Sequence, residues 1–201
     1  MKKGLLIVLS GPSGVGKGTV CRSLQARMPG LCFSVSATTR PPRPGEIEGR
    51  DYYFLSDDHF QRLLAEGAFL EWALVHGRHY GTLKDKVSKV LASGNDLLLE
   101  IDIQGAEQVR RQMPEAVTIF MAPPSMAALE QRIIGRGTED AVKIRQRLEA
   151  ARREMEAYRN YEYLVVNDEV EATAALLASI IQSEKCRVSR GARPPVQEVS
   201  E

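Results

Sequence analysis

A glycine-rich segment near the start of the chain has the residue types and spacing needed to bind phosphate groups. It reads Gly11-Pro12-Ser13-Gly14-Val15-Gly16-Lys17. Its glycines let successive backbone N–H groups turn toward phosphate oxygens, and a helix that starts here adds the positive end of its dipole. Lys17 can then reach the β- and γ-phosphates of a nucleotide with one compact charge. The segment therefore predicts a phosphate-binding loop.

The residues on either side of this segment fit such a loop. Residues 5–9 form a continuous apolar run, which predicts a strand buried on both faces. From Lys17 onward, Val20, Leu24 and Met28 recur every four residues, as on one face of a helix. A GxxxxGK match arises by chance in roughly one chain in twenty of this length. The strand before it and the helix after it favour a functional loop over a chance match.

One position departs from the usual phosphate loop. The Ser or Thr that ligates Mg²⁺ after the lysine is replaced by Gly18, and Thr19 follows. Either Thr19 supplies the oxygen instead, or the metal is held mainly by phosphates and water. The motif thus predicts a phosphate site more firmly than it predicts a protein ligand for Mg²⁺.

The rest of the chain alternates strand-like and helix-like segments. Helical patterns lie at residues 104–113, 125–134, 141–158 and 170–187, and apolar runs typical of buried strands lie at residues 97–101, 117–121 and 164–166. This alternation indicates βαβ units and an α/β fold, with a central parallel sheet flanked by helices. Ligands gather at the carboxyl ends of such strands, so Asp102, which follows one of the runs, is a candidate site residue.

Residues 36–82 interrupt this alternation. They are rich in Arg, Pro, Tyr and Gly, with short candidate strands at 51–55 and 69–75 and a candidate helix at 57–65. We interpret this segment as a small mixed α/β insertion into the phosphate-loop core.

The chain is thereby divided into a core and two appendages. Glycines on both sides of Arg136 predict a mobile lid at about 135–145 within the core. The predicted units are the core at residues 1–35 and 83–188, the insertion at residues 36–82 and a disordered tail at residues 189–201.

The insertion carries its own candidate anion site. Arg40 and Arg43 lie in a proline-stiffened loop, and Tyr52 follows nearby. Two guanidinium groups and a phenol can bind a phosphate monoester in a forked arrangement. Taken alone, the same residues also fit a solvated basic loop.

Composition limits the classes of partner. The 27 basic and 26 acidic residues nearly cancel, so overall charge gives no support for nonspecific nucleic-acid or membrane binding. The apolar segment near the N-terminus is too short for a signal peptide or a membrane span. Cys21, Cys32 and Cys186 have no CxxC spacing and indicate neither a disulfide framework nor a zinc site. We expect a cytoplasmic protein with small-molecule substrates.

Several motifs occur in order along the chain and together carry a resemblance. Besides the phosphate loop they are residues 34–46, Phe69-Leu70-Glu71-Trp72-Ala73, His79-Tyr80-Gly81-Thr82, Glu100-Ile101-Asp102-Ile103-Gln104-Gly105-Ala106, Gly135-Arg136-Gly137-Thr138 and Val165-Val166-Asn167-Asp168. In this combination the chain resembles the guanylate kinase family over residues 5–187. The resemblance implies the reaction ATP + GMP ⇌ ADP + GDP, a step in guanine nucleotide recycling, with Mg²⁺ as cofactor.

The resemblance also implies two sets of substrate-binding residues. Glu71 suits guanine because its carboxylate can accept from both N1–H and the 2-amino group, while Asp102 can take the remaining amino hydrogen. Hydroxyls of Ser36 and Thr82 can donate to guanine O6. By this resemblance ATP is bound by Gly11, Pro12, Ser13, Gly14, Val15, Gly16, Lys17, Gly18, Thr19 and Asn167, and GMP by Ser36, Arg40, Arg43, Tyr52, Glu71, Tyr80, Thr82 and Asp102.

The same resemblance assigns the catalytic groups. Lys17 would neutralise the donor phosphates, and Arg132, Arg136 and Arg147 would stabilise the transferring group. No strong base is needed, because the acceptor phosphate oxygen is already an anionic nucleophile. Glu100 lies where Asp is common in the family, in a suspected indirect role toward Mg²⁺.

Two other readings compete with this activity. A guanylate-kinase-like domain can be a binding module without catalysis, but the intact phosphate loop with Lys17 and the lid arginines count against it. A phosphate-loop kinase for another small acceptor, such as a ribose phosphate, would leave Glu71, Thr82 and Asp102 without a purpose. No oligomeric state is predicted.

Overall fold

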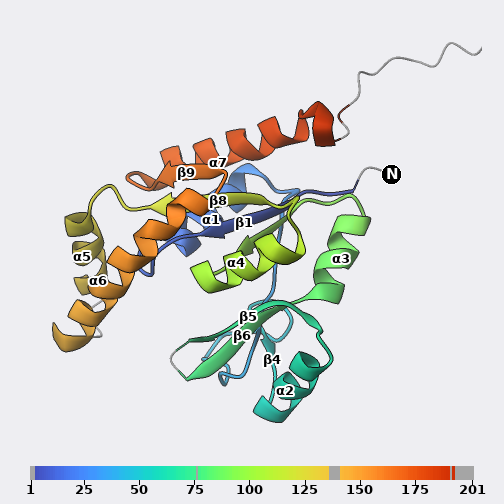
Figure 1. The fold of residues 1–201 in the computed structure, drawn as a ribbon, viewed down its shortest axis with the longest axis horizontal. Coiled ribbons are helices and arrows are strands. Elements are labelled where there is room, and N and C mark those ends of the chain that lie inside the picture. Colours follow the sequence, from blue (N-terminus) through green and yellow to red (C-terminus); the bar gives the residue numbers. More distant parts are fainter. Residues whose placement is uncertain (1–2, 76, 136–140, 191, 193–201) are drawn as a thin grey trace, which may run out of the picture.

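A parallel sheet forms the centre of the molecule (Figure 1). The computed structural model describes residues 3–75, 77–135, 141–190 and 192. Within these residues, five strands pair in parallel in the order β2-β7-β1-β8-β9. Their bounds are Cys32–Phe33 for β2, Leu97–Glu100 for β7, Leu6–Ser10 for β1, Val117–Ala122 for β8 and Tyr163–Val166 for β9.

Helices cover both faces of this sheet, which explains why β1 is buried at every position and apolar up to Ser10. In Figure 1, α7 (Val170–Lys185) lies above the sheet, and α3 (Lys84–Ala92) and α4 (Ile103–Gln112) lie below it. Ile7 and Leu9 pack toward α7 and α1 (Lys17–Arg27), whereas Leu6 and Val8 pack toward α3 and α4. Side chains alternate across a strand, so β1 contributes to both apolar layers.

The insertion is a second, smaller sheet that lies below the core in Figure 1. In the described part of the chain it has four strands in the order β4-β3-β6-β5. They are β4 (Tyr53–Phe54), β3 (Ala37–Thr38), β6 (Arg78–Leu83) and β5 (Phe69–Val75), with β3–β4 parallel and the other pairs antiparallel. Helix α2 (Asp57–Ala65) closes its small core, in which the rings of Phe60 and Phe69 stack at 4.3 Å.

Two helices project from the core beside the carboxyl ends of the strands. These are α5 (Met126–Ile134) and α6 (Ala141–Met155), which pack together through Leu129, Ile133 and Ala151. A 3₁₀ helix, η1 (Glu156–Asn160), leads from α6 back to β9. Of the predicted lid at about 135–145, residues 136–140, which include Arg136, lie outside the described residues, whereas Gly135 is the C-cap of α5 and residues 141–145 begin α6.

The structure confirms the predicted α/β class with a central parallel sheet, and it corrects several local assignments. The predicted helix at 141–158 changes to 3₁₀ geometry after Met155, and the predicted strand at 51–55 is reduced to Tyr53–Phe54. Strand β6 and helix α3 were not expected, because the polar, glycine-containing β6 has no apolar run and α3 has no side-chain N-cap. None of the described helices has the length and apolar character of a membrane span.

A buried carboxylate fastens the end of α7 to the sheet. Glu184 accepts hydrogen bonds from the Tyr163 hydroxyl, from Arg187 at 3.1 Å and from Arg190 at 2.6 Å. Arg190 also donates to the Glu115 carbonyl at 2.6 Å. Arg190 falls in the tail predicted to be disordered, yet it is bonded into the fold within a short 3₁₀ helix, Val188–Arg190. Residues 191 and 193–201 lie outside the described part.

Glu184 should stabilise the protein in a pH-dependent way. Burial alone raises the pKa of this carboxyl, but its bonds from Tyr163, Arg187 and Arg190 outweigh burial and lower the pKa below the ordinary 4.5. A lowered folded-state pKa means that the stabilisation is complete above the unfolded value and is lost as pH falls through the folded value.

We therefore expect Glu184→Gln to lower the free energy of unfolding at pH 7 by about 3 kcal/mol, as when a buried ion pair is broken from one side. In urea unfolding experiments, the difference from wild type should shrink as pH falls below about 4. Glu171→Gln is the matched control, since Glu171 lies on the same helix and pairs with Arg27, but its side chain is 71% exposed. A difference for Glu184→Gln that stays constant from pH 7 to pH 3 would contradict the role of its charge.

Candidate active site

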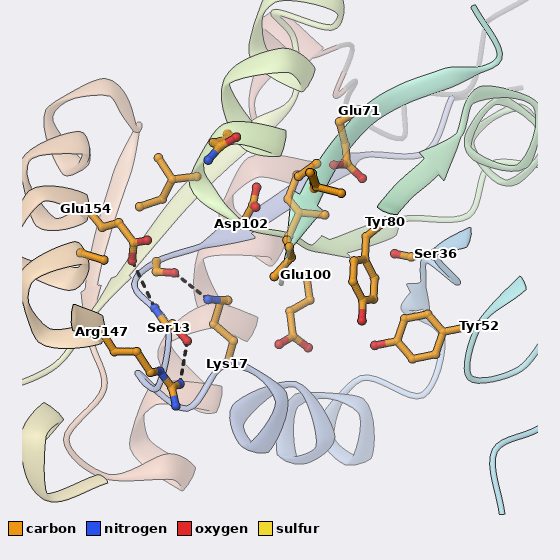
Figure 2. Close-up of a pocket in the computed structure, with 18 residues that line it drawn as sticks. Ser13, Lys17, Ser36, Tyr52, Glu71, Tyr80, Glu100, Asp102, Arg147 and Glu154 are labelled. Carbon is orange, nitrogen blue, oxygen red and sulfur yellow. Dashed lines mark hydrogen bonds between the residues drawn. The ribbon is translucent and has the colours of Figure 1, made fainter. Parts of the chain in front are cut away.

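A pocket of about 520 Å³ opens between the core and the insertion (Figure 2). Figure 2 shows side chains of the insertion on one side, those of the phosphate loop and α6 on the other, and Glu100 and Asp102 between them. This is the carboxyl edge of the parallel sheet, where ligands bind in open α/β folds. Of the residues predicted as site residues, the pocket is lined by Gly11, Ser13, Lys17, Ser36, Tyr52, Glu71, Tyr80, Asp102 and Arg147.

The phosphate loop follows β1 and depends on two glycines. A side chain at Gly11 would place its Cβ 2.1 Å from the Met121 carbonyl oxygen of the neighbouring strand β8. Gly16 precedes α1 with a left-handed φ of 100°, and no side chain caps the helix there. The N–H groups that begin α1 are therefore available to an anion.

Asn167, predicted to bind ATP, and Arg132, predicted to be catalytic, both support the phosphate loop. The Asn167 amide donates to the Val15 carbonyl at 2.7 Å, and the Arg132 guanidinium donates to the same carbonyl at 3.1 Å. Arg132 also bonds the Asn167 carbonyl at 2.9 Å. In this structure these side chains hold the loop in shape and do not line the pocket. Their predicted contacts with adenine and with the transferring phosphate stay predictions.

Lys17 is held inside the pocket by its own loop. Its ammonium donates to the Gly11 carbonyl at 2.6 Å. Burial lowers the pKa of this ammonium, and the nearby carboxylates of Glu100 and Glu154 oppose that effect. An anionic phosphate in the same place would stabilise the protonated form further.

Glu71 is the buried carboxylate of the pocket. It lies on β5 opposite Thr82 of β6, and an irregular register between Phe69 and Glu71 accompanies this placement. The Thr82 hydroxyl donates to Glu71 Oε1 at 2.6 Å. Thr82 thus orients Glu71, whereas the sequence suggested a donor to guanine O6. Burial raises the pKa of Glu71 to about 7, against the hydrogen bond from Thr82, and Asp102 adds to the rise.

A glycine in α4 leaves room for this carboxylate. Asp102 caps the helix by accepting from the Gly105 N–H at 2.7 Å. A Cβ at Gly105 would lie 2.4 Å from Glu71 Oε2 and 3.3 Å from Asp102 Oδ1. Gly105 therefore fixes where Glu71 can sit, a role the sequence analysis did not assign. The available signal was a glycine inside a helix, which usually has a packing reason.

Two tyrosines form the opposite end of the pocket. The rings of Tyr52 and Tyr80 meet edge-on at 6.0 Å, and the Arg40 guanidinium lies 5.3 Å from the Tyr52 ring centre. Burial, and secondarily Tyr80, raises the pKa of Tyr52, so its phenol stays protonated and can donate to an anion.

Arg40 and Arg43 are brought together by one carboxylate. Glu46 accepts from two nitrogens of the Arg40 side chain, at 2.8 and 3.0 Å, and from the Arg43 backbone N–H at 2.7 Å. The Arg43 side chain is exposed. These contacts fix the loop beside Tyr52, and neither arginine is among the residues that line the pocket.

The lid residues and Thr19 differ in how they relate to the pocket. Arg147 of α6 lines it and donates to the Ser13 hydroxyl at 2.9 Å. Arg136 lies outside the described residues. Thr19 is exposed and accepts from Arg22 at 3.2 Å. The sequence analysis missed Glu154, which lines the pocket about two helical turns after Arg147 on the same face of α6.

The region around Gly18 suits a metal held mainly by substrate. A Cβ at Gly18 would lie 3.6 Å from a Glu100 carboxylate oxygen, so one acidic group stands beside the position that usually carries a ligating hydroxyl. Within the described residues, no group of three or more His, Cys, Asp or Glu side chains could form a metal site. Mg²⁺ commonly takes only one or two carboxylates together with phosphates and water, and this arrangement fits that pattern.

Comparisons with known proteins agree in pointing to one family. The guanylate kinase family model matches residues 3–184. The guanylate kinase of Symbiobacterium thermophilum is 52% identical over 188 residues, which are 94% of this chain and 89% of that protein. The guanylate kinase of Desulfitobacterium hafniense is 52% identical over 187 residues, 93% of this chain and 94% of that protein. The crystal structure of guanylate kinase from Anaplasma phagocytophilum matches with a TM-score of 0.75 and 34% identity, and covers 94% of this chain and 90% of that one. The chain therefore belongs to the guanylate kinase family.

Proposed function

We propose that this protein catalyses the transfer of the γ-phosphate of ATP to GMP, giving ADP and GDP. The observation that carries the proposal is a single pocket lined at one end by the phosphate loop with Lys17 and at the other by the buried carboxylate of Glu71. The first group suits a triphosphate and the second suits the N1–H and 2-amino donors of guanine.

The donor half of the mechanism rests on the loop. Its N–H groups and Lys17 would bind the β- and γ-phosphates and stabilise the charge that develops during in-line transfer. Arg147 already lies against the loop, and Arg132 and Arg136 are proposed to join it over the transferring group. No covalent enzyme intermediate is required, because a phosphate oxygen of GMP is itself the nucleophile.

The acceptor half rests on the insertion. Tyr52, Tyr80, Arg40 and Arg43 are proposed to bind the phosphate of GMP, and Ser36, Glu71 and Asp102 its base. Thr82 would act by holding Glu71. Such an arrangement puts the acceptor phosphate between the tyrosines and Lys17.

Mg²⁺ is proposed as the cofactor. Glu100 is the carboxylate positioned to approach it, directly or through water, while Gly18 leaves space and Thr19 is turned to solvent. When bound with ATP, the ion would neutralise the β- and γ-phosphate oxygens.

The division into core, insertion and lid has a purpose under this proposal. Water in the pocket would hydrolyse ATP, so the units at residues 36–82 and about 135–145 are proposed to close on the core when both substrates are bound. A cytoplasmic location, where ATP and GMP would both be encountered, completes the proposal.

Lys17→Ala tests the donor site. Removing one electrostatic contact to the transferring group is expected to lower kcat by about 10²–10³. The dissociation constant of GMP should change little, because Lys17 is assigned to the donor. Coupled-assay kinetics and GMP titration calorimetry measure the two quantities, and a variant with half of wild-type turnover would exclude this role of the loop.

Glu71→Gln tests base recognition. AMP lacks the 2-amino group and presents a lone pair at N1. Each buried carboxylate oxygen that AMP leaves unpaired should weaken its binding by about 1–3 kcal/mol. We expect wild-type kcat/KM for GMP to exceed that for AMP by about 10³ or more. Glu71→Gln should remove most of this ratio by impairing GMP, whereas Glu66→Gln, exposed at the end of α2, should leave it unchanged. Equal kcat/KM values for GMP and AMP in the wild type would refute the proposal.

The pH dependence of kcat/KM in the wild type and in Glu71→Gln gives a second test of base recognition. Because the pKa of Glu71 is raised to about 7, the free enzyme loses this acceptor charge as pH falls below 7, and kcat/KM for GMP should fall with it. In Glu71→Gln the pH profile of kcat/KM should not fall near pH 7. It should fall only near pH 6, where the phosphate of GMP is protonated. Superimposable acid limbs for the two enzymes would show that Glu71 does not titrate there.

Gly105→Ala tests whether the space beside Glu71 sets guanine recognition. Alanine favours a helix by about 1 kcal/mol over glycine, and this gain opposes the cost of moving the buried Glu71 carboxylate away from Thr82, about 1–3 kcal/mol. Tm should therefore fall only slightly. The added Cβ displaces Glu71, and we expect kcat/KM for GMP to fall about tenfold, the loss of one good hydrogen bond. KM for ATP should not change. In the Glu71→Gln background the added effect should disappear, and a full tenfold loss there would mean that Gly105 acts elsewhere.

A further inference from the structure

A carboxylate of α6 occupies part of the phosphate loop. Glu154 Oε2 accepts a hydrogen bond from the backbone N–H of Ser13 at 3.3 Å (Figure 2). Arg147, about two turns earlier on the same face of α6, donates to the Ser13 hydroxyl at 2.9 Å. The helix thus contacts one loop residue with a negative group and a positive group.

The negative group has the chemistry of the ligand that the loop is built for. Phosphate-loop N–H groups bind anionic oxygens, and a carboxylate oxygen is an anionic acceptor of similar kind. Glu154 lines the same pocket as Lys17, and its charge favours the protonated form of Lys17. It therefore makes, toward Ser13 and Lys17, interactions of the kind that a phosphate group would make.

We propose that Glu154 is an anionic placeholder that competes with the donor phosphates for the phosphate loop. The inference rests on the proposed function in taking a nucleoside di- or triphosphate as the ligand. A second anion cannot bind beside Glu154 without repulsion, so the carboxylate leaves Ser13 when the nucleotide arrives. Nucleotide affinity is lowered by the free energy of that displacement.

The displacement also links donor binding to the position of α6. Glu154 and Arg147 are on one helix, so breaking the Glu154–Ser13 contact frees α6 to shift while Arg147 turns from the Ser13 hydroxyl to the incoming phosphates. A purely structural contact makes the opposite prediction, because its loss would loosen α6 and weaken nucleotide binding.

The test is ADP binding to Glu154→Gln, measured by titration calorimetry without GMP. The variant keeps the shape of the side chain and removes its charge. Exposed charge interactions are worth up to about 1 kcal/mol, which corresponds to roughly fivefold in affinity, so ADP should bind up to about fivefold more tightly to Glu154→Gln than to the wild type. Adenosine, which has no phosphate, should bind both proteins equally. Glu149→Gln, at an exposed position of α6, should behave as the wild type.

A second variant, Glu154→Asp, and ADP binding by the wild type distinguish failure of the placeholder role from failure of the proposed function. Glu154→Asp keeps the charge but shortens its reach, and should give ADP affinity between those of the wild type and Glu154→Gln. Unchanged or weaker ADP binding by both variants, with Tm intact, would overturn the placeholder role. Absence of ADP binding by the wild type would instead refute the proposed function itself.

Discussion

The site depends on holding charged groups away from water before any substrate neutralises them. Lys17 and Glu71 face one pocket from different elements. Burial lowers the pKa of Lys17 and raises the pKa of Glu71, so in both cases it favours the neutral form. Isolated buried charges are costly, so each must be given local partners, which here are the Gly11 carbonyl and the Thr82 hydroxyl. Under the proposed function, substrate phosphates and a guanine base would supply further partners, and this electrostatic cost would become selectivity for ligands that carry the matching groups.

Rigid packing beneath the pocket makes that arrangement possible. Every residue of β1 is buried, and alternate side chains anchor it in the apolar layers on both faces of the sheet. The phosphate loop starts where this strand ends and is fixed from behind by Asn167 and Arg132. The insertion has its own small core around Phe60 and Phe69, so β5 and β6 can present Glu71 and Thr82 as a fixed cross-strand pair.

Glycines that lack a side chain also shape the site. Gly11 allows the loop to pass against β8, and Gly105 leaves the volume that the Glu71 carboxylate occupies. Gly18 lacks the ligating hydroxyl that Ser or Thr would bring to this position, and the space beside it faces the Glu100 carboxylate. At Gly11 and Gly105 an added methyl group would overlap an oxygen of a residue distant in sequence, and the fit exists only because separate elements approach closely.

The sequence by itself determined the α/β class and the glycine-rich loop between a buried strand and a helix, because these depend on local periodicity and glycine spacing. Helix α2 and strand β5 were predicted to the residue for the same reason. The residues assigned to guanine came from the family resemblance and stay predictions. Only the tertiary structure decided that Thr82 bonds Glu71, that Asn167 and Arg132 brace the loop, and that Glu154 reaches Ser13. Those contacts join residues up to 152 positions apart, and no local pattern encodes which distant partner a polar side chain meets when the chain packs.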